Sequence, residues 1–246
     1  MHKPDPTIVL VHGAFAESAS WNGVVERLHT RSLDVVAVAN PLRSLTGDAA
    51  YVRDVIAGLG ERVVLVGHSY AGLVITEAAA GNERVSALVY VCAFCPDHGE
   101  DAFGLSTKFP GSTLGDALIG YPVSTGGNEL AIKQDLYPQQ FAADVPEPQA
   151  ALMAATQRPV TEAALTEGLP TETPAWKRIP SWFVIGAQDR NIPAAVQRFG
   201  AERAGARGVR EVPSGSHAVA VSNPDVVAET ILDAVAAVLP QASAAG

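Results

Sequence analysis

The sequence predicts an α/β protein: a mostly parallel sheet of about six strands, with helices on both faces and an inserted, mainly helical cap. Short apolar runs rich in β-branched residues alternate with helical patterns through the first third of the chain, and the alternation returns after residue 181. The segment between these stretches is too long for one crossover helix. A chain of 246 residues can bury a large core in one such domain.

The first third of the chain contains four predicted strands, joined by helices long enough to connect parallel neighbours. Each strand is a short run dominated by valine, leucine or isoleucine. Ser18 or Ser20 is expected to cap the first helix. In chain order we expect a strand at 8–11, a helix at 20–28, a strand at 35–38, a helix at 48–59, a strand at 63–66, a helix after Ser69 and a strand at 85–91.

The alternation stops after residue 91 and returns only near the C-terminus. We therefore expect an α/β core made of residues 1–95 and 177–246, with residues 96–176 inserted as the cap. The small, polar tail at 241–246 is expected to fray. The second half of the core is predicted to consist of a strand at 181–185, a helix at 194–204, a strand at 209–212 and a helix at 225–238.

The cap itself contains three recognisable local signals. Pro148 stands in the first turn of a predicted helix at 148–157, and Thr161 is expected to cap a second, short helix. Residues 121–133 alternate around the turn Thr125-Gly126-Gly127-Asn128, which favours a small hairpin.

A serine lies where the third predicted strand turns sharply into a helix. Residues 63–72 read Val-Val-Leu-Val-Gly-His-Ser-Tyr-Ala-Gly. A serine on such a turn has a strained backbone, so the residues two before and two after it must be nearly free of side chain. Gly67 and Ala71 occupy these positions, with one methyl more than the strict glycine pattern allows. The pattern predicts that Ser69 is a nucleophile.

A nucleophilic serine needs a base, and the base needs a carboxylate that fixes its tautomer. His217 follows the last predicted strand, and Asp189 follows the strand before it. Because the carboxyl ends of parallel strands meet at one edge of the sheet, both are expected beside Ser69. Asp97, which follows the preceding strand, is the alternative acid.

Two backbone N–H groups are expected to bind the oxyanion that forms during attack. One belongs to Tyr70, directly after the serine. The other comes from the loop after the first strand, residues 12–15, where Gly13 lets the chain turn tightly. We assign it to the N–H of Ala14, with that of Phe15 as the alternative.

Other reactive side chains are expected to carry no chemistry. His29 is expected in solvent, and His68 is expected to pack beside the turn that holds Ser69. Cys92 and Cys95 match Cys-x-x-Cys but lack further zinc ligands. In extended chain their Cα atoms would lie roughly 10 Å apart, too far for a disulfide. We expect two ordinary thiols.

These motifs make the chain resemble the α/β-hydrolase superfamily over nearly its full length, and most of all the small branch of plant methyl-ester esterases, hydroxynitrile lyases and bacterial esterases. The resemblance implies Ser69 as nucleophile, His217 as base, Asp189 as acid, and Ala14 and Tyr70 as oxyanion donors. It rests on V-L-V-H-G-A at 9–14, Trp21, G-H-S-Y-A-G at 67–72, A-F-C-P-D at 93–97, Q-D-R-N-I-P at 188–193 and S-H-A-V at 216–219.

Two departures argue against neighbouring chemistries. The lyases typically carry threonine in place of Gly13, and lysine directly after the catalytic histidine, where this chain has Ala218. Dehalogenases and epoxide hydrolases of the superfamily use aspartate as the nucleophile, where this chain has Ser69. Cyanohydrin cleavage and both aspartate chemistries are therefore disfavoured.

Composition argues against several partners. The formal net charge of −9, without any Lys/Arg cluster longer than a pair, disfavours nucleic acid and anionic membranes. No apolar run approaches the roughly 18 residues that span a bilayer. With two cysteines and no hydrophobic signal region, we expect a cytoplasmic protein. No metal or organic cofactor is implied, and the oligomeric state stays open.

We therefore expect a serine hydrolase that cleaves an ester or lactone of a small, mostly apolar carboxylic acid through an acyl-enzyme intermediate. The side chains of Phe15, Tyr70 and Phe94 are expected to line its substrate site. Two alternatives stay open. The same triad would also serve perhydrolysis of the haloperoxidase type or C–C bond hydrolysis, and the fold would also serve a non-catalytic, receptor-like module.

Overall fold

A six-stranded parallel sheet forms the centre of the molecule. The computed structural model describes residues 5–239, so the tail at 241–246 lies outside the described residues. The strand order is β2-β1-β3-β4-β8-β9, and every neighbouring pair is parallel. The predicted fold class is thus confirmed. The strands are β1 (Thr7–Val11), β2 (Val35–Val38), β3 (Val63–His68), β4 (Val85–Val91), β8 (Ser181–Gly186) and β9 (Gly208–Val212).

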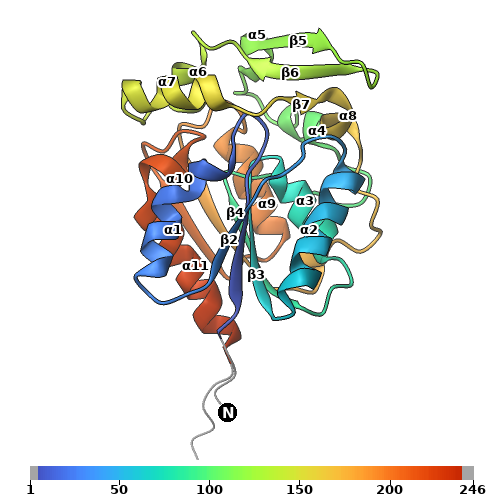
Figure 1. The fold of residues 1–246 in the computed structure, drawn as a ribbon, viewed down its shortest axis with the longest axis vertical. Helices are drawn as coiled ribbons and strands as arrows, with labels where there is room; N and C mark the ends of the chain where they lie inside the picture. Colours follow the sequence, from blue (N-terminus) through green and yellow to red (C-terminus); the bar gives the residue numbers. More distant parts are fainter. Residues whose placement is uncertain (1–4, 240–246) are drawn as a thin grey trace, which may run out of the picture.

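Helices cover both faces of this sheet (Figure 1). Because successive side chains of a strand point to opposite faces, β1 contributes to two cores. Val9 and Val11 pack with α2 and α3, while Ile8 and Leu10 pack with α1 and α11. One face carries α1 (Asn22–His29), α10 (Val219–Ser222) and α11 (Pro224–Val238), and the other carries α2 (Leu45–Leu59), α3 (Ala71–Ala79) and α9 (Ala194–Arg203).

The start of the first helix differs from the prediction. A short 3-10 helix, η1 (Ser18–Trp21), precedes α1, and the side chain of Glu17 accepts a hydrogen bond from its first turn. The residue that caps α1 is Trp21, which makes no side-chain capping bond. Both predicted serines lie inside η1, so neither can occupy the capping position of α1. The local sequence could not distinguish the capping position of α1 from the turn that precedes it, since serine is favoured in both.

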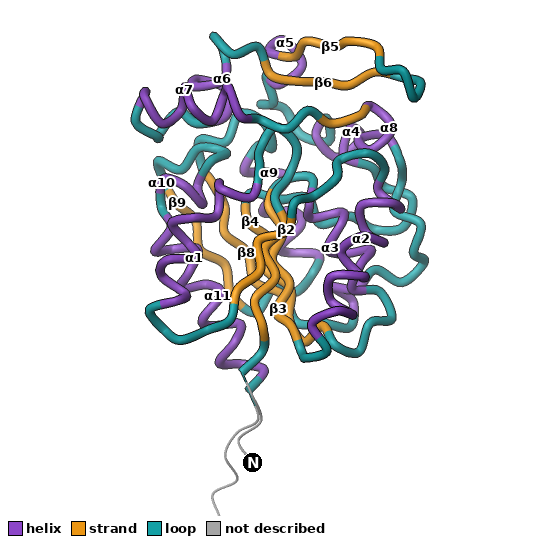
Figure 2. The backbone as a smooth tube through the Cα atoms, in the orientation of Figure 1, coloured by secondary structure: helices purple, strands orange, loops and turns teal. Residues whose placement is uncertain are grey.

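The segment that joins β4 to β8 first lies over the carboxyl edge of the sheet and then runs back along α3 to the start of β8 (Figures 1 and 2). The predicted hairpin is confirmed as β5 (Leu118–Pro122) and β6 (Asn128–Ile132), and a two-residue strand, β7 (Val160–Thr161), extends it to three strands. The cap helices are α4 (Ala102–Ser106), α5 (Leu114–Ala117), α6 (Tyr137–Phe141), α7 (Glu147–Thr156), α8 (Glu162–Thr166) and the 3-10 turn η2 (Ala175–Lys177).

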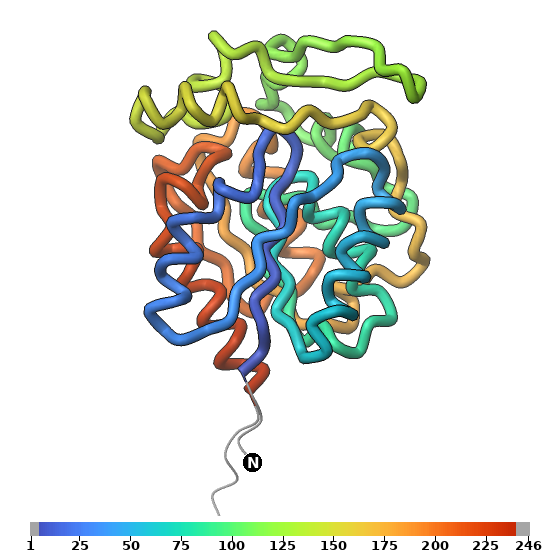
Figure 3. The backbone as a smooth tube through the Cα atoms, in the orientation of Figure 1, coloured from blue at the N-terminus to red at the C-terminus, as the bar shows by residue number. Residues whose placement is uncertain are grey.

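Thr161 caps α8 as expected, because its hydroxyl oxygen accepts the N–H of Ala164 at 3.2 Å. The strand β7 was not predicted, since two residues carry no periodic signal and pair only because the fold brings them to β6. In Figure 3 the cap, green to yellow, lies above strands from both halves of the core. None of the helices within residues 5–239 is both long and apolar enough to cross a membrane.

Candidate active site

Ser69 stands at the end of β3, on the turn that leads into α3. Its φ is 60°, a left-handed conformation that is rare for residues other than glycine. The turn is closely packed: a Cβ on Gly67 would lie 2.7 Å from the carbonyl oxygen of Ala71, and one on Gly72 would lie 1.9 Å from that of Phe94. These close contacts allow only glycine at positions 67 and 72, while the buried methyl of Ala71 is accommodated.

Three side chains from separate loops form one hydrogen-bonded chain at this turn. The Ser69 hydroxyl lies 2.8 Å from Nε2 of His217, and Nδ1 of His217 lies 2.7 Å from Oδ2 of Asp189. The remaining Asp189 bonds come from the N–H groups of Asn191 and Ile192 and from the Gln197 amide. A carboxylate held in this way directs the histidine proton to Nδ1, which leaves Nε2 free to accept the serine proton.

The alternative acid does not reach the histidine. The Asp97 carboxylate lies 2.7 Å from Nζ of Lys177, and its side chain is 39% exposed. The His217 imidazole, in contrast, is buried and faces Asp189. Of the two candidates that follow strands, only Asp189 is therefore placed to orient the base.

The loop after β1 lies directly against the serine turn. A Cβ on Gly13 would come 2.5 Å from Cβ of Ser69, so only glycine allows this approach. The Phe15 N–H is already used, because it donates to the carbonyl oxygen of Arg158 at 3.1 Å. Among residues 5–239, the N–H groups of Ala14 and Tyr70 have no hydrogen-bond acceptor. This geometry favours Ala14 over Phe15 as the second oxyanion donor.

His12 and Asn40 hold this loop, a role that the sequence analysis missed. The Nδ1–H of His12 donates to the carbonyl oxygen of Gly13 at 2.9 Å, and its Nε2 accepts the Asn40 N–H at 3.0 Å. The Asn40 amide donates back to the His12 carbonyl oxygen at 2.9 Å. Burial lowers the pKa of His12 to about 4, so its ring is neutral at pH 7, as one donor and one acceptor nitrogen require.

His68 packs beside the serine turn, as expected. Its Nε2–H donates to the carbonyl oxygen of His217 at 2.9 Å, and its ring makes edge contacts with Trp21 and Phe141. Burial lowers the pKa of His68 well below its usual range. A neutral ring beside His217 avoids the repulsion that a second imidazolium would cause.

A cavity of about 600 Å³ opens beside Ser69. Of the three side chains expected in the substrate site, Phe15 and Phe94 line this cavity and Tyr70 does not, because its hydroxyl donates to the buried Asp48 carboxylate at 2.9 Å. The Tyr70 ring therefore points into the core and away from this cavity. Most of the remaining wall comes from the cap and is apolar, with Phe103, Leu114, Leu118, Leu130 and Leu165 among its residues.

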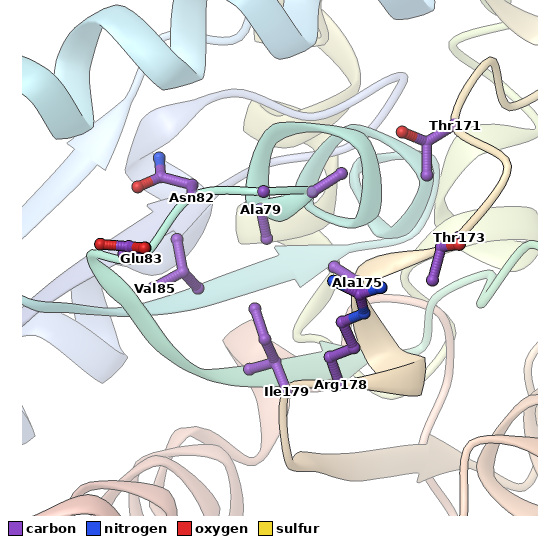
Figure 4. A pocket seen from close by; sticks show the side chains of 11 residues that line it. Ala79, Asn82, Glu83, Val85, Thr171, Thr173, Ala175, Arg178 and Ile179 are labelled. Carbon is purple, nitrogen blue, oxygen red and sulfur yellow. The ribbon is translucent and has the colours of Figure 1, made fainter.

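A second cavity of about 600 Å³ lies far from this chemistry, at the end of α3 and the start of β4 (Figure 4). Its wall carries Glu83, Thr171 and Arg178, but neither the serine nor the residues bonded to it. It is therefore separate from the candidate active site.

Known proteins resemble the chain along almost all of its length. The sequence matches the alpha/beta hydrolase family over residues 8–230. Alpha/beta hydrolase nvfD of Aspergillus novofumigatus is 31% identical over 93% of this chain and 96% of that protein. Polyneuridine aldehyde esterase of Rauvolfia serpentina is 24% identical over 94% of this chain and 96% of that protein. A crystal structure of polyneuridine aldehyde esterase superposes with a TM-score of 0.79 at 21% identity, covering 94% and 99% of the two chains.

The fold and the family match together define the class: the chain belongs to the α/β-hydrolase family. Its relatives are named hydrolases and esterases, which supports ester hydrolysis in general.

Proposed function

We propose that this protein is a serine hydrolase that cleaves a carboxylic ester or lactone of a small, mostly apolar acid through an acyl-enzyme. The observation that carries the proposal is the buried chain from Ser69 through His217 to Asp189, which opens on a largely apolar cavity. An apolar cavity suits an apolar acyl group, because such a group loses no hydrogen bonds when it leaves water.

The proposed reaction has two half-reactions. His217 removes the Ser69 proton as Oγ attacks the ester carbonyl, and the resulting oxyanion lies against the N–H groups of Ala14 and Tyr70. The imidazolium returns that proton to the leaving alkoxide as the C–O bond breaks. Water then attacks the acyl-enzyme, with His217 again as base, and releases the acid and the free Ser69 hydroxyl. Asp189 stabilises the imidazolium in both steps.

A fluorophosphonate probe and a panel of esters and lactones test the proposal. Wild-type protein should react covalently at one residue and hydrolyse at least one substrate of the panel, while Ser69→Ala should lose the labelling and lower turnover by several orders of magnitude. Labelling that persists in Ser69→Ala would remove Ser69 from its role. Absence of both labelling and hydrolysis in the wild type would favour a receptor-like module.

Substrate choice is proposed to reside in the cap. The cap supplies most of the cavity wall, whereas Ser69, His217 and Asp189 all belong to loops of the core. Replacing the cap with that of another esterase should change the preferred acyl group, while a small aryl acetate should still be cleaved through Ser69.

A further inference from the structure

The loop that carries His217 is held by a segment of the cap. His217 lies between β9, which ends at Val212, and the short helix α10, which begins at Val219. A loop of this kind is mobile unless other elements hold it. From the cap, the end of α6 and the residues that follow it contact both this loop, at Ser216, and the end of α10.

Asp144 is the centre of these contacts. Its Oδ1 accepts a hydrogen bond from the hydroxyl of Ser216, the residue directly before His217. Its Oδ2 accepts the hydroxyl of Ser222 at 2.7 Å and lies 3.4 Å from the amide nitrogen of Asn223. One carboxylate thus ties the residue before the histidine to the far end of the helix after it.

The Ser216 hydroxyl also contacts the backbone of the loop that carries His217 and the backbone of the cap. Its oxygen accepts the N–H of Ala218 at 3.1 Å and lies 3.2 Å from the carbonyl oxygen of Phe141. The Ser216 hydroxyl therefore links two cap residues, Phe141 and Asp144, to Ala218, the residue directly after His217. Since Ser216 is buried, loss of its acceptor would leave a hydroxyl without its charged partner in the interior.

Phe141 completes the contact from the cap. Its ring meets the His217 ring edge-on, with 4.8 Å between centroids and an interplanar angle of 87°. The phenyl ring is itself stacked on Tyr137, at 4.8 Å. Both rings are buried, so the imidazole is shielded from water and limited in rotation on this side.

We propose that Asp144 is a positioning residue: through Ser216 and Ser222 it holds the loop that presents His217 to Ser69. This inference rests on the proposed serine hydrolase function. Asp144 does not line the cavity beside Ser69, so it acts on the base rather than on the substrate. The cap then has a second task besides forming the wall of the substrate site, because it also supports the catalytic base.

The test compares Asp144→Ala and Asp144→Asn with Asp135→Asn, an exposed carboxylate of the cap that makes no side-chain hydrogen bond within residues 5–239. A displacement of about 1 Å at a catalytic group can cost about 10²-fold in rate. Asp144→Ala should therefore lower kcat for an aryl acetate by about 10- to 100-fold, with KM changed less than about threefold. The rate of fluorophosphonate labelling should fall in the same ratio. Asp135→Asn should match the wild type.

Asp144→Asn should lie between Asp144→Ala and the wild type, because it keeps one acceptor oxygen. The double variant Asp144→Ala/Ser216→Ala should lose no more activity than the more damaged single variant, since the two side chains act as one unit. If Asp144→Ala does not fold, as judged by thermal unfolding, Asp144→Asn and Ser216→Ala carry the same comparison. A kcat and a labelling rate within twofold of the wild type would overturn the inference, as would a change confined to KM.

Hydrogen exchange separates failure of this inference from failure of the proposed function. Amides of residues 213–222 should exchange faster in Asp144→Ala than in the wild type, whether or not the protein hydrolyses esters. Unchanged exchange there would overturn the inference alone. A wild type that neither labels nor hydrolyses would overturn the proposed function, and with it the catalytic meaning of Asp144.

Discussion

Replacing Gly13 by alanine should damage catalysis much more than folding. The added Cβ would lie 2.5 Å from Cβ of Ser69, 2.6 Å from the His68 carbonyl oxygen and 3.1 Å from Oγ of Ser69, whereas ordinary contacts begin at 3.4 Å. The loop after β1 must therefore retreat by about 1 Å, which is enough to cost about 10²-fold in rate. The retreat carries the Ala14 N–H away from the oxyanion, and loss of one such donor costs about 10²- to 10³-fold in kcat.

The assay is the hydrolysis of an aryl acetate by Gly13→Ala, together with fluorophosphonate labelling and thermal unfolding. The matched control is Gly58→Ala in α2, where a Cβ meets no atom within 4 Å. That control should keep the wild-type kcat and unfold at an equal or slightly higher temperature, because alanine favours a helix by at most about 1 kcal/mol over glycine. A folded Gly13→Ala with kcat within threefold of the wild type would refute the reasoning.

Three further predictions follow from the geometry. Asp189→Asn should lower kcat by about 10⁴-fold and Asp97→Asn by less than about tenfold, and the reverse ranking in steady-state kinetics would move the acid to Asp97. Burial gives His12 a pKa of about 4 in the folded protein, whereas the same histidine in the unfolded chain binds a proton below about pH 6.5. Lowering the pH from 7 to 5 should therefore lower the free energy of unfolding by about 2 kcal/mol. Urea unfolding of His12→Gln should show a smaller loss, and an equal loss would contradict the assignment. Leu165→Ala, which enlarges the cavity, should change discrimination between short and long acyl esters by about 1–3 kcal/mol, as ratios of kcat/KM measure, and an unchanged preference would remove Leu165 from the acyl site.

The strands and the order of the candidate site residues could be predicted because their signals are local. A valine-rich run predicts a buried parallel strand wherever it stands, and the structure has β2 and β4 at the predicted residues. Parallel strands also end at one edge, so the sequence predicts that Ser69, Asp189 and His217 lie together. Their hydrogen-bonded arrangement agrees with that expectation.

Short elements without a turn or capping signal of their own could not be predicted, because their conformation depends on neighbours distant in the chain. The strand β7 forms only by pairing with β6, and the residues that begin the first helix adopt a 3-10 turn that serine composition does not reveal. The orientation of the Tyr70 side chain likewise could not be predicted from neighbouring residues. Its aromatic ring was expected in the substrate site, yet the buried Asp48 carboxylate holds its hydroxyl in the core.

The sequence by itself therefore determined the fold class and the candidate catalytic residues, because a few neighbouring residues are enough to encode a buried strand or the turn that holds the serine. Tertiary structure alone decided how those residues are supported. The Arg158 carbonyl oxygen accepts the Phe15 N–H, so the Ala14 N–H is the one left without an acceptor among residues 5–239. Asp144, from another part of the chain, accepts the Ser216 hydroxyl. No local pattern encodes such contacts, since each depends on the packing of the whole cap against the edge of the sheet.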